Sequence, residues 1–475
     1  MSERTGFIDG VVDRTLDNVR WLRLVWRDIA SRGRISSAAP KPELPRDDAE
    51  RLRQQLRDCL DAKGGAVAAR ARAADLGRTY LALNATGRER FLYLLASEFD
   101  IDRGTVDILA QRVLTVERDE RPPIEKALRD ALEPPRLKLL TQFNGLPEGV
   151  KFLVDLRAEL MTLSRNNPVL AALESDLKDL LASWFDVGFL ELRRITWDTP
   201  AALLERLARY EAVHRVRNWA DMKNRLDPDR RCFAYFHPRM PDEPLIFVEI
   251  ALVKGLADDV QALLDLGAPL GDPDAADTAI FYSISNCQTG LSGISFGDFL
   301  IKRVADRLHA ELPQLKTFAT LSPIPGLRPW LQRQIAAGTK LLTDGEREHL
   351  NETVGTDTLD KILARPRWHE DPVVTEALRG PLMRLSARYL LLEKRATTGT
   401  AADSVAHFHL TNGARMEQLD WLADTSANGL KQSYGMMINY LYRLSEIEQN
   451  HEAYISERHI AASPAIQRLA KAPAT

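Results

Sequence analysis

Apolar residues recur at three- and four-residue spacing from about Asp47 to Leu181. This period is typical of amphipathic helices that bury one face. No convincing strand pattern interrupts it, and prolines divide it into separate helices at Pro122, Pro123, Pro134 and Pro135. A proline-containing linker over residues 36–46 joins this region to an earlier amphipathic helix. We therefore expect an all-helical domain over residues 1–184.

The pattern changes after about Trp184, where short runs rich in β-branched and aromatic residues appear between turns marked by Pro or Gly. These runs predict strands over residues 232–236, 245–253, 279–285 and 316–321. A helical insertion over 329–394 follows, then a further strand over 405–410 and a last helix over about 429–447. We therefore expect an α/β domain over residues 185–475, and an α+β chain as a whole.

Composition and charge limit the number of domains, the kinds of partner and the compartment that we expect. A chain of 475 residues with 45% hydrophobic residues is long enough for two domains or more. Its formal net charge of -3 gives no overall field that would attract nucleic acid or an anionic membrane. The three cysteines, Cys59, Cys232 and Cys287, lack the short spacing of metal or redox pairs, which fits a reducing compartment.

Targeting and membrane segments are not expected. Acidic residues such as Asp9 and Asp13 interrupt the N-terminal arginines, whereas import peptides are poor in acids. The longest informative uncharged stretch, residues 278–297, contains serines, an asparagine, a glutamine and three glycines, which a bilayer core disfavours. We expect a cytoplasmic protein without a membrane span.

A glycine-containing turn joins a predicted strand to a predicted helix over residues 281–308, with glycines at Gly290, Gly293 and Gly297. Glycines let backbone N–H groups approach a phosphate closely, and the helix start adds its positive dipole end. The segment has neither the nucleotide P-loop pattern nor the dinucleotide fingerprint. It is closer to the phosphate loop of acyl-coenzyme A (CoA) transferases. The alternative is an ordinary strand-to-helix turn, in which Asp298 caps the helix.

Two further residues are candidates for chemistry. Ser322 follows a predicted strand in the run Thr320-Leu-Ser-Pro-Ile-Pro-Gly326, where two prolines and a glycine give a rigid exit. A turn serine bonded to its own backbone is the competing interpretation. His409 shares its predicted strand face with His407, so a metal site and a pair of structural histidines also compete. No clear cluster of carboxylates or cysteines completes a metal ligand set, and Cys287 is a weaker candidate nucleophile.

Several blocks in one order make a more specific signal than any single motif. The chain resembles malonyl-CoA decarboxylases, a similarity that runs through nearly all of it after the first few dozen residues. The matching blocks are Trp184-Phe185 with Gly188-Phe-Leu190, Glu211-Ala-Val-His214 with Asn218-Trp219, Phe281-Tyr-Ser-Ile-Ser285, Gly297 with Phe299-Leu-Ile-Lys-Arg-Val304, Leu321-Ser-Pro-Ile-Pro-Gly326, Phe408-His-Leu410 with Asn412-Gly-Ala414, and Asn439-Tyr440 with Tyr442.

The resemblance implies a helical domain used in self-association, as a dimer or tetramer, and a catalytic domain with the GNAT-like (acyl-CoA N-acyltransferase-like) fold. It implies that Ser322 and His409 are the catalytic pair. The thioester carbonyl of malonyl-CoA can act as the electron sink, so we expect no cofactor or metal. It further implies contacts with malonyl-CoA by Ser292, Gly293, Ile294, Ser295, Phe296, Gly297 and Asp298, with Ser283 and Tyr442 in support. Some family members carry an acidic residue where Ser295 stands, so no role for that carboxylate is carried over.

The expected reaction is the conversion of malonyl-CoA to acetyl-CoA and carbon dioxide. In this hypothesis Ser322 bonds the departing carboxylate or the oxyanion, and His409 protonates the resulting carbon. Two other functions compete with this one. They are an acyl-CoA-dependent acyltransferase, which needs an acceptor, and a non-catalytic CoA-thioester sensor whose helical domain binds a partner.

Overall fold

The structure is a computed structural model that describes residues 22–31, 40–61, 65–294, 300–356 and 358–471. The chain divides into two compact units. The first unit comprises Met1–Glu191 with two later segments, Phe236–Pro244 and Gln288–Phe296. The second unit comprises Leu192–Tyr235, Leu245–Cys287 and Gly297–Thr475.

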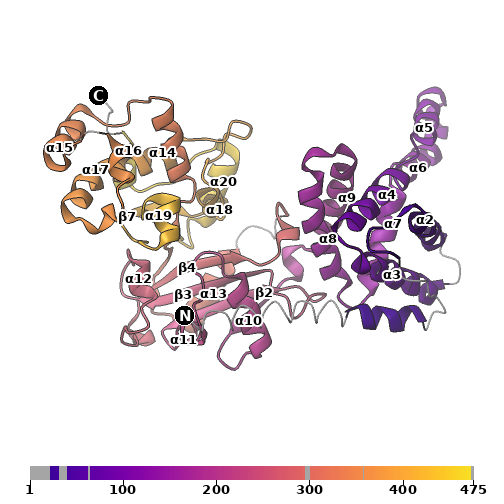
Figure 1. Cartoon of the computed structure of the whole chain (residues 1–475), viewed down its shortest axis with the longest axis horizontal. Coiled ribbons are helices and arrows are strands. Elements are labelled where there is room, and N and C mark those ends of the chain that lie inside the picture. The colour runs from indigo at the N-terminus through magenta and orange to yellow at the C-terminus, as the bar shows by residue number, and fades with distance from the viewer. Residues whose placement is uncertain (1–21, 32–39, 62–64, 295–299, 357, 472–475) are drawn as a thin grey trace. The chain divides into compact units, whose positions relative to one another are not determined.

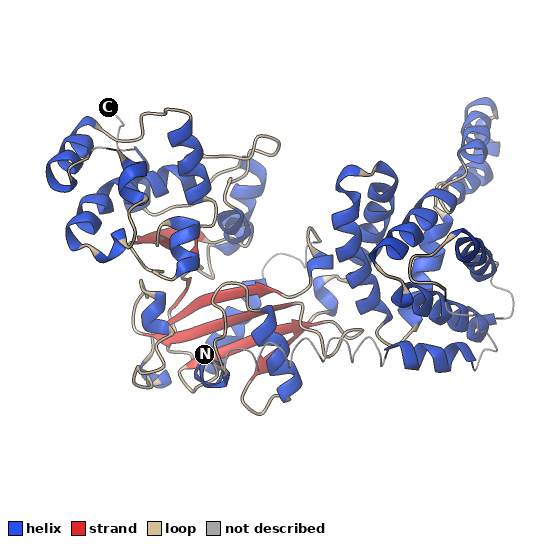
Figure 2. Ribbon diagram, in the orientation of Figure 1, coloured by secondary structure: helices blue, strands red, loops and turns tan. Residues whose placement is uncertain are grey.

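Helices make up most of the first unit (Figure 2). A helix over residues 22–31 precedes α2 (Arg46–Leu60), α3 (Gly65–Ala82), α4 (Ala85–Glu98), α5 (Arg103–Thr115), α6 (Arg121–Ala131), α7 (Pro135–Gln142), α8 (Gly149–Leu163) and α9 (Pro168–Trp184). Local signals set several of the starts. The Asn167 side chain, for example, accepts hydrogen bonds from two backbone N–H groups at the start of α9. Pro168, the first residue of this helix, has no N–H group to satisfy. The helical pattern expected from Asp47 to Leu181 is confirmed.

The core of the helical unit is aromatic and leucine-rich. Trp26 is fully buried, packs edge-on against Phe152, and donates from its indole N–H to the carbonyl of Pro147 at 3.0 Å. Four leucines at helical spacing line the inner face of α9 and are likewise fully buried: Leu170, Leu173, Leu177 and Leu181. The hydrophobic face expected from the sequence is therefore the face that packs.

A mixed sheet organises the second unit (Figure 1). Its strands are β1 (Glu191–Ile195), β2 (Arg230–Phe236), β3 (Ile246–Val253), β4 (Thr278–Asn286), β5 (Thr317–Thr320), β6 (Ser322–Pro323), β7 (Arg415–Asp420) and β8 (Met437–Leu441). They lie in the order β1-β2-β3-β4-β5-β8-β6, and β7 pairs with β8. Strands β4 and β5 run parallel and pair over Thr278–Phe281 and Thr317–Thr320, whereas the pairs β2–β3, β3–β4 and β5–β8 are antiparallel.

The helices of the second unit lie before, between and after these strands. Those between β1 and β5 are α10 (Ala201–Tyr210), α11 (Trp219–Asn224), α12 (Val260–Leu263) and α13 (Leu300–Glu311). Those after β6 are α14 (Leu327–Ala336), α15 (Asp344–Val354), α16 (Leu359–Leu363), α17 (Pro372–Leu392), α18 (Ser404–Thr411), α19 (Ala427–Ser433), α20 (Ile447–Glu457) and α21 (Pro464–Lys471). The helical insertion expected over 329–394 is confirmed by α14 to α17.

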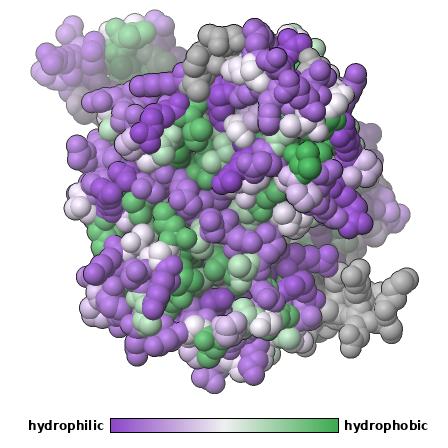
Figure 3. Space-filling model, turned by 90° about the vertical axis from the view of Figure 1, so that its left-hand side faces the viewer, coloured by the Kyte–Doolittle hydropathy of each residue, from purple (hydrophilic) through white to green (hydrophobic). Residues whose placement is uncertain are grey.

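The exposed face in Figure 3 is mainly hydrophilic, with narrow hydrophobic patches between polar residues. This distribution is usual for helices whose apolar faces pack inward. No described helix combines the length and the apolar character needed to cross a bilayer.

Four predicted strands are confirmed as β2, β3, β4 and β5, with ends that shift by a residue or two. The strand predicted over 405–410 is wrong, because these residues form α18. Asp403 caps the helix, and Ala406, His409 and Leu410 form its buried face at helical spacing. A short apolar run fits a strand and a helix equally well, and here the cap decides.

The prediction of one helix over residues 429–447 is also wrong for the middle of that range. Helix α19 ends at Ser433, and Tyr434 and Gly435 then adopt left-handed backbone conformations, with φ of 56° and 83°. The following residues form β8, all of which are buried. A central strand that pairs on both sides shows a continuous apolar run rather than alternation, so its pattern resembles that of a buried helix.

Candidate active site

Ser322 and His409 meet in the second unit although 87 positions separate them in the sequence. Ser322 Oγ lies 3.0 Å from His409 Nε2, and both side chains are buried. Strand pairing holds Ser322, since β6 pairs with β8 at Ile438. Helix α18 presents His409 on its buried face. The two candidates that the sequence singled out are thus within hydrogen-bond distance.

A phenolic partner completes the pair. Tyr442 Oη lies 2.7 Å from His409 Nδ1, and the ring of Tyr440 stacks on the imidazole with centroids 4.4 Å apart. Ser322 in turn donates to Thr320 Oγ1 at 2.8 Å. One continuous chain of hydrogen bonds therefore joins Tyr442, His409, Ser322 and Thr320, in this order.

Burial sets the protonation states in this chain. It lowers the pKa of His409 to about 3, because the apolar surroundings do not solvate an imidazolium. It also raises the pKa of Tyr442 far above its ordinary value, so the phenol is protonated in the resting site. His409 Nδ1 lies where it can accept from that O–H group. If Tyr442 donates to Nδ1, the neutral imidazole carries its own hydrogen on Nε2, directed at Ser322.

A cavity of about 250 Å³ opens on this pair. Its lining is mainly apolar and contains no lysine or arginine: Val213, Phe281, Tyr282, Ile284, Asn286, Leu321, Ser322, Pro323, Ser404, Val405, Phe408 and His409. Such a site offers neutral hydrogen-bond donors and little competition from water.

Asp403 joins the two segments that carry Ser322 and His409. Its Oδ1 accepts from the N–H groups of Val405 and Ala406 at the start of α18, at 3.0 and 3.1 Å. Its Oδ2 accepts from the N–H of Gly326 at 3.0 Å, four residues after Ser322. A Cβ at position 326 would lie 1.9 Å from Tyr389 Oη, so only glycine allows this close approach.

The supporting residues expected from the sequence lie in different places. Tyr442 contacts His409 directly. Ser283 does not line the cavity; its hydroxyl donates to both carboxylate oxygens of Glu211, at 2.8 and 2.7 Å. Thr320, Tyr440 and Asp403 were missed. Thr320 lies two residues before Ser322, and the period-2 rule for strands is a signal that identifies such a neighbour.

The described part of the glycine turn after β4, residues 288–294, belongs to the helical unit. Ser292 and Gly293 are exposed there, and Ile294 is buried. Ser295, Phe296, Gly297 and Asp298 lie outside the described residues.

The histidine pair considered for metal binding is not arranged for it. His407 bonds the hydroxyl of Tyr454 at 2.8 Å, while both ring nitrogens of His409 lie on Ser322 and Tyr442. Residues two apart on a helix point in different directions, so the shared strand face does not exist. Within the described ranges, no group of three potential ligands among His, Cys, Asp and Glu lies together.

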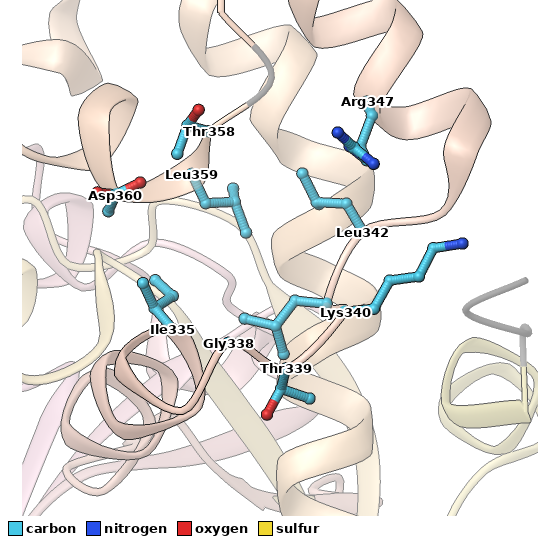
Figure 4. Close-up of a pocket in the computed structure, with 10 residues that line it drawn as sticks. Ile335, Gly338, Thr339, Lys340, Leu342, Arg347, Thr358, Leu359 and Asp360 are labelled. Carbon is cyan, nitrogen blue, oxygen red and sulfur yellow. The ribbon is translucent and has the colours of Figure 1, made fainter.

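Two other hollows of the described second unit contain neither Ser322 nor His409. One of about 350 Å³ lies in the helical insertion, where Ile335, Leu342 and Leu359 point inward and the ammonium of Lys340 points away (Figure 4). A larger one of about 890 Å³ shares Val213 with the Ser322–His409 cavity. We therefore take the cavity beside Ser322 and His409 as the candidate active site.

A buried, neutral serine–histidine pair in an apolar cavity beside a mixed sheet is typical of an enzyme that uses general acid–base chemistry. Comparison of the chain with models of known families identifies the family to which this enzyme belongs. The model of the malonyl-CoA decarboxylase C-terminal domain matches residues 188–475, and that of the N-terminal domain matches residues 99–185. The chain belongs to the malonyl-CoA decarboxylase family.

Individual relatives agree with this assignment. A protein of the goose Anser anser anser named "Malonyl-CoA decarboxylase, mitochondrial" is 38% identical over 413 residues, which cover 82% of either chain. The mouse protein of the same name is 38% identical over 405 residues, 81% of this chain and 82% of that one.

Solved structures give the same result. The crystal structure of malonyl-CoA decarboxylase from Rhodopseudomonas palustris matches with a TM-score of 0.81 and 39% sequence identity. The match covers 88% of this chain and 99% of that one. That from Agrobacterium vitis has the same identity and coverage and a TM-score of 0.80.

The buried state of His409 predicts how stability depends on pH. The unfolded imidazole titrates near its ordinary pKa of 6.5, whereas the pKa of the folded one is about 3. Protons therefore bind the unfolded state more readily, and the free energy of unfolding falls as the pH drops below 6.5. Between about pH 7.5 and 5.5 we expect the wild type to lose about 1.4 kcal/mol more than His409→Asn. Urea titrations at both pH values measure this; equal losses in the two proteins would contradict the prediction.

The link through Asp403 predicts a loss of both stability and turnover. Asp403→Ala removes a helix cap, which costs about 1 to 2 kcal/mol, and frees Gly326 from α18. The matched control is Asp371→Ala, which removes the cap of α17 through Val373 and Val374 but touches neither catalytic segment. We expect similar shifts of the unfolding midpoint in both variants, with lower turnover only in Asp403→Ala. Unchanged turnover in Asp403→Ala would show that this link does not position the pair.

Proposed function

We propose that Ser322 and His409 carry out the decarboxylation of malonyl-CoA within the apolar cavity beside β6 and α18. The activity itself follows from the family: the chain is a carboxy-lyase that converts malonyl-CoA to acetyl-CoA and carbon dioxide. The observation that carries the residue assignment is the 3.0 Å contact between Ser322 Oγ and His409 Nε2 in a cavity without cationic side chains.

The reaction needs little from the protein beyond placement and hydrogen bonds. When the bond between the carboxylate carbon and Cα breaks, its electron pair enters the thioester and forms an enolate. The thioester carbonyl is the electron sink. A proton must then reach Cα to complete the methyl group of acetyl-CoA, so each turnover consumes one proton. Stabilising the enolate oxygen and supplying this proton are the tasks left to side chains.

The hydrogen-bond chain supports a role for each side chain. Ser322, which donates to Thr320 in the structure, turns its hydroxyl to the substrate carboxylate or to the enolate oxygen. His409 gives its Nε2 hydrogen to Cα, and Tyr442 passes its hydrogen to Nδ1 at the same time. A proton from solvent then reaches Nε2, and Nδ1 returns its hydrogen to the phenolate, which restores both groups. Neutral imidazole suits this step because the enolate carbon is a much stronger base.

The apolar lining favours departure of carbon dioxide. A lysine or arginine on the carboxylate would stabilise the ground state most, since the negative charge leaves that group during the reaction. Neutral donors in a water-poor cavity bind the carboxylate weakly and the enolate oxygen more strongly. The lining of the cavity meets this requirement.

The coenzyme end of the substrate is assigned to the glycine turn and the residues directly after it. In this proposal Ser292, Gly293, Ile294, Ser295, Phe296, Gly297 and Asp298 contact malonyl-CoA, chiefly through backbone N–H groups. The exposed position of Ser292 and Gly293 supports it. Asp298 turns away from the phosphates, because its negative charge would repel them.

For the catalytic domain we propose the GNAT-like fold. Its support is the short parallel pairing of β4 with β5 inside a sheet in which the pairs β2–β3, β3–β4, β5–β8, β6–β8 and β7–β8 are antiparallel. The division at residues 184 and 185 likewise remains our proposal for the domain boundary.

Substitution of the pair is the direct test. We expect Ser322→Ala and His409→Asn to lower carbon dioxide release from malonyl-CoA by about 10² to 10⁴, the usual contribution of a positioned acid or base. Both should retain CoA binding. His407→Asn is the matched control, because His407 lies on the same helix but bonds Tyr454. Release is measured without any acyl acceptor, so an acyltransferase would produce none. Near-normal turnover in either variant would refute the assignment.

Self-association through the helical unit, as a dimer or tetramer, is a separate proposal. Helix α5 has no buried residue, and Ile108 and Leu114 on it are 64% and 76% exposed. Exposed aliphatic side chains on a helix that buries none of its own residues favour contact with a second copy of the chain.

The combined variant Ile108→Glu/Leu114→Glu should therefore reduce the molar mass in solution toward that of one chain. Light scattering coupled to size-exclusion chromatography measures this, with Val373→Glu, at a 57% exposed position of α17, as the control. A wild type that is already monomeric would contradict the proposal, as would a variant that keeps the wild-type mass.

We also propose a cytoplasmic location. The support is that Cys59, Cys232 and Cys287 are all free and buried, which fits a reducing compartment. The goose and mouse relatives are named as mitochondrial proteins.

A further inference from the structure

The glycine turn that follows β4 has a cation beside it that the sequence did not reveal. Gly293 has a φ of 73°, in the left-handed region, and its N–H meets no backbone acceptor among the described residues. Lys178 of α9 reaches over this turn. Its Nζ lies 3.9 Å from where a Cβ of residue 293 would be. The exposed residue Ser292 is adjacent in the chain.

The turn is held rigidly on the helical unit. Arg157 of α8 is buried, and its Nη1 donates to the carbonyls of Gly290 and Ser292 at 2.6 and 3.0 Å. A Cβ at position 290 would lie 1.7 Å from the carbonyl oxygen of Val154, so the backbone packs directly on α8. Arg157 thus supplies the hydrogen bonds that the carbonyls of Gly290 and Ser292 need. The N–H of Gly293 does not have to bond either of them.

The same arginine engages the acid that would otherwise pair with Lys178. Glu174, one helical turn before Lys178, is the acid best placed to pair with it. Its Oε1 instead accepts from Arg157 Nε and Nη2, at 2.9 and 2.7 Å. No ion pair of Lys178 within 4.0 Å is found in the described part of the chain, and its side chain is half-buried. An ammonium without an ion pair among the described residues, close to a turn whose Gly293 N–H has no described acceptor, is an arrangement that suits an anion.

We propose that Lys178 binds a phosphate group of coenzyme A, together with the N–H of Gly293. The helical unit then contributes a substrate-binding residue of its own. This inference rests on the proposed contact between the glycine turn and malonyl-CoA. Lysine acts on phosphate as a mobile point charge, so it tolerates the pyrophosphate and the 3′-phosphate equally well.

The test compares a substrate that has phosphates with one that lacks them. For malonyl-CoA, Lys178→Ala should raise KM about tenfold, the effect of losing one charge-assisted hydrogen bond, with kcat unchanged. For malonyl-pantetheine, which carries no nucleotide, the ratio of variant to wild-type kcat/KM should stay near one. Lys178→Arg should restore most of the affinity. Lys138→Ala, at a lysine of α7 in the same unit, is the matched control.

Two outcomes would overturn the proposal. One is an unchanged KM for malonyl-CoA in Lys178→Ala, and the other is an equal loss with malonyl-pantetheine. The variant Gly293→Ala distinguishes a wrong assignment of Lys178 from a wrong assignment of the glycine turn. Its methyl group strains a left-handed backbone position and fills the space under Lys178. If Gly293→Ala raises KM and Lys178→Ala does not, the turn binds CoA without the lysine. If neither variant changes KM, the turn is not the CoA site.

Inhibition by CoA and by 3′-dephospho-CoA identifies the phosphate. A loss of affinity in Lys178→Ala that disappears with 3′-dephospho-CoA assigns the lysine to the 3′-phosphate. A loss that persists assigns it to the pyrophosphate.

Discussion

The chemistry that we propose for this protein depends on the burial of one imidazole. His409 is enclosed by Tyr440 on one face and held at its two nitrogens by Tyr442 and Ser322. Water is the solvent that would stabilise an imidazolium, and its exclusion brings the pKa down to about 3. The histidine is therefore neutral throughout the physiological range, which is unusual for this residue type. A neutral donor fits a reaction whose substrate carries its charge on the group that leaves.

Such a site is possible only if two distant segments are brought together with little freedom. Ser322 lies on a two-residue strand, and His409 lies on a helix of eight residues. Neither element is long enough to be rigid alone. Asp403 connects them by capping the helix with one carboxylate oxygen and holding Gly326 with the other. The prolines around Ser322 restrict the same exit, so chain stiffness and a buried carboxylate act on the same small region.

Sequence patterns predicted those parts of the molecule that depend on local periodicity. The leucines of α9 and the β-branched runs of β2 to β5 belong to this group. The patterns failed at α18 and β8, where a buried helix and a central strand both have short apolar runs. Ser322 and His409 were found from motif and resemblance. Thr320, Tyr440 and Asp403 were missed because their role depends on contacts between segments, and only a folded chain shows those contacts.

The helical unit also shapes the turn that follows β4. Arg157 and Val154 of α8 hold the backbone of residues 290–292, so the turn that follows β4 takes its shape from helices encoded more than a hundred residues earlier. Gly290 is required for that contact, because any side chain would separate the turn from α8. Glycines in this loop therefore serve two different purposes: Gly290 allows close packing against protein, whereas Gly293 provides a left-handed bend beneath Lys178. A substitution at Gly290 would act through the packing of the turn on α8, and one at Gly293 through the anion site that we propose.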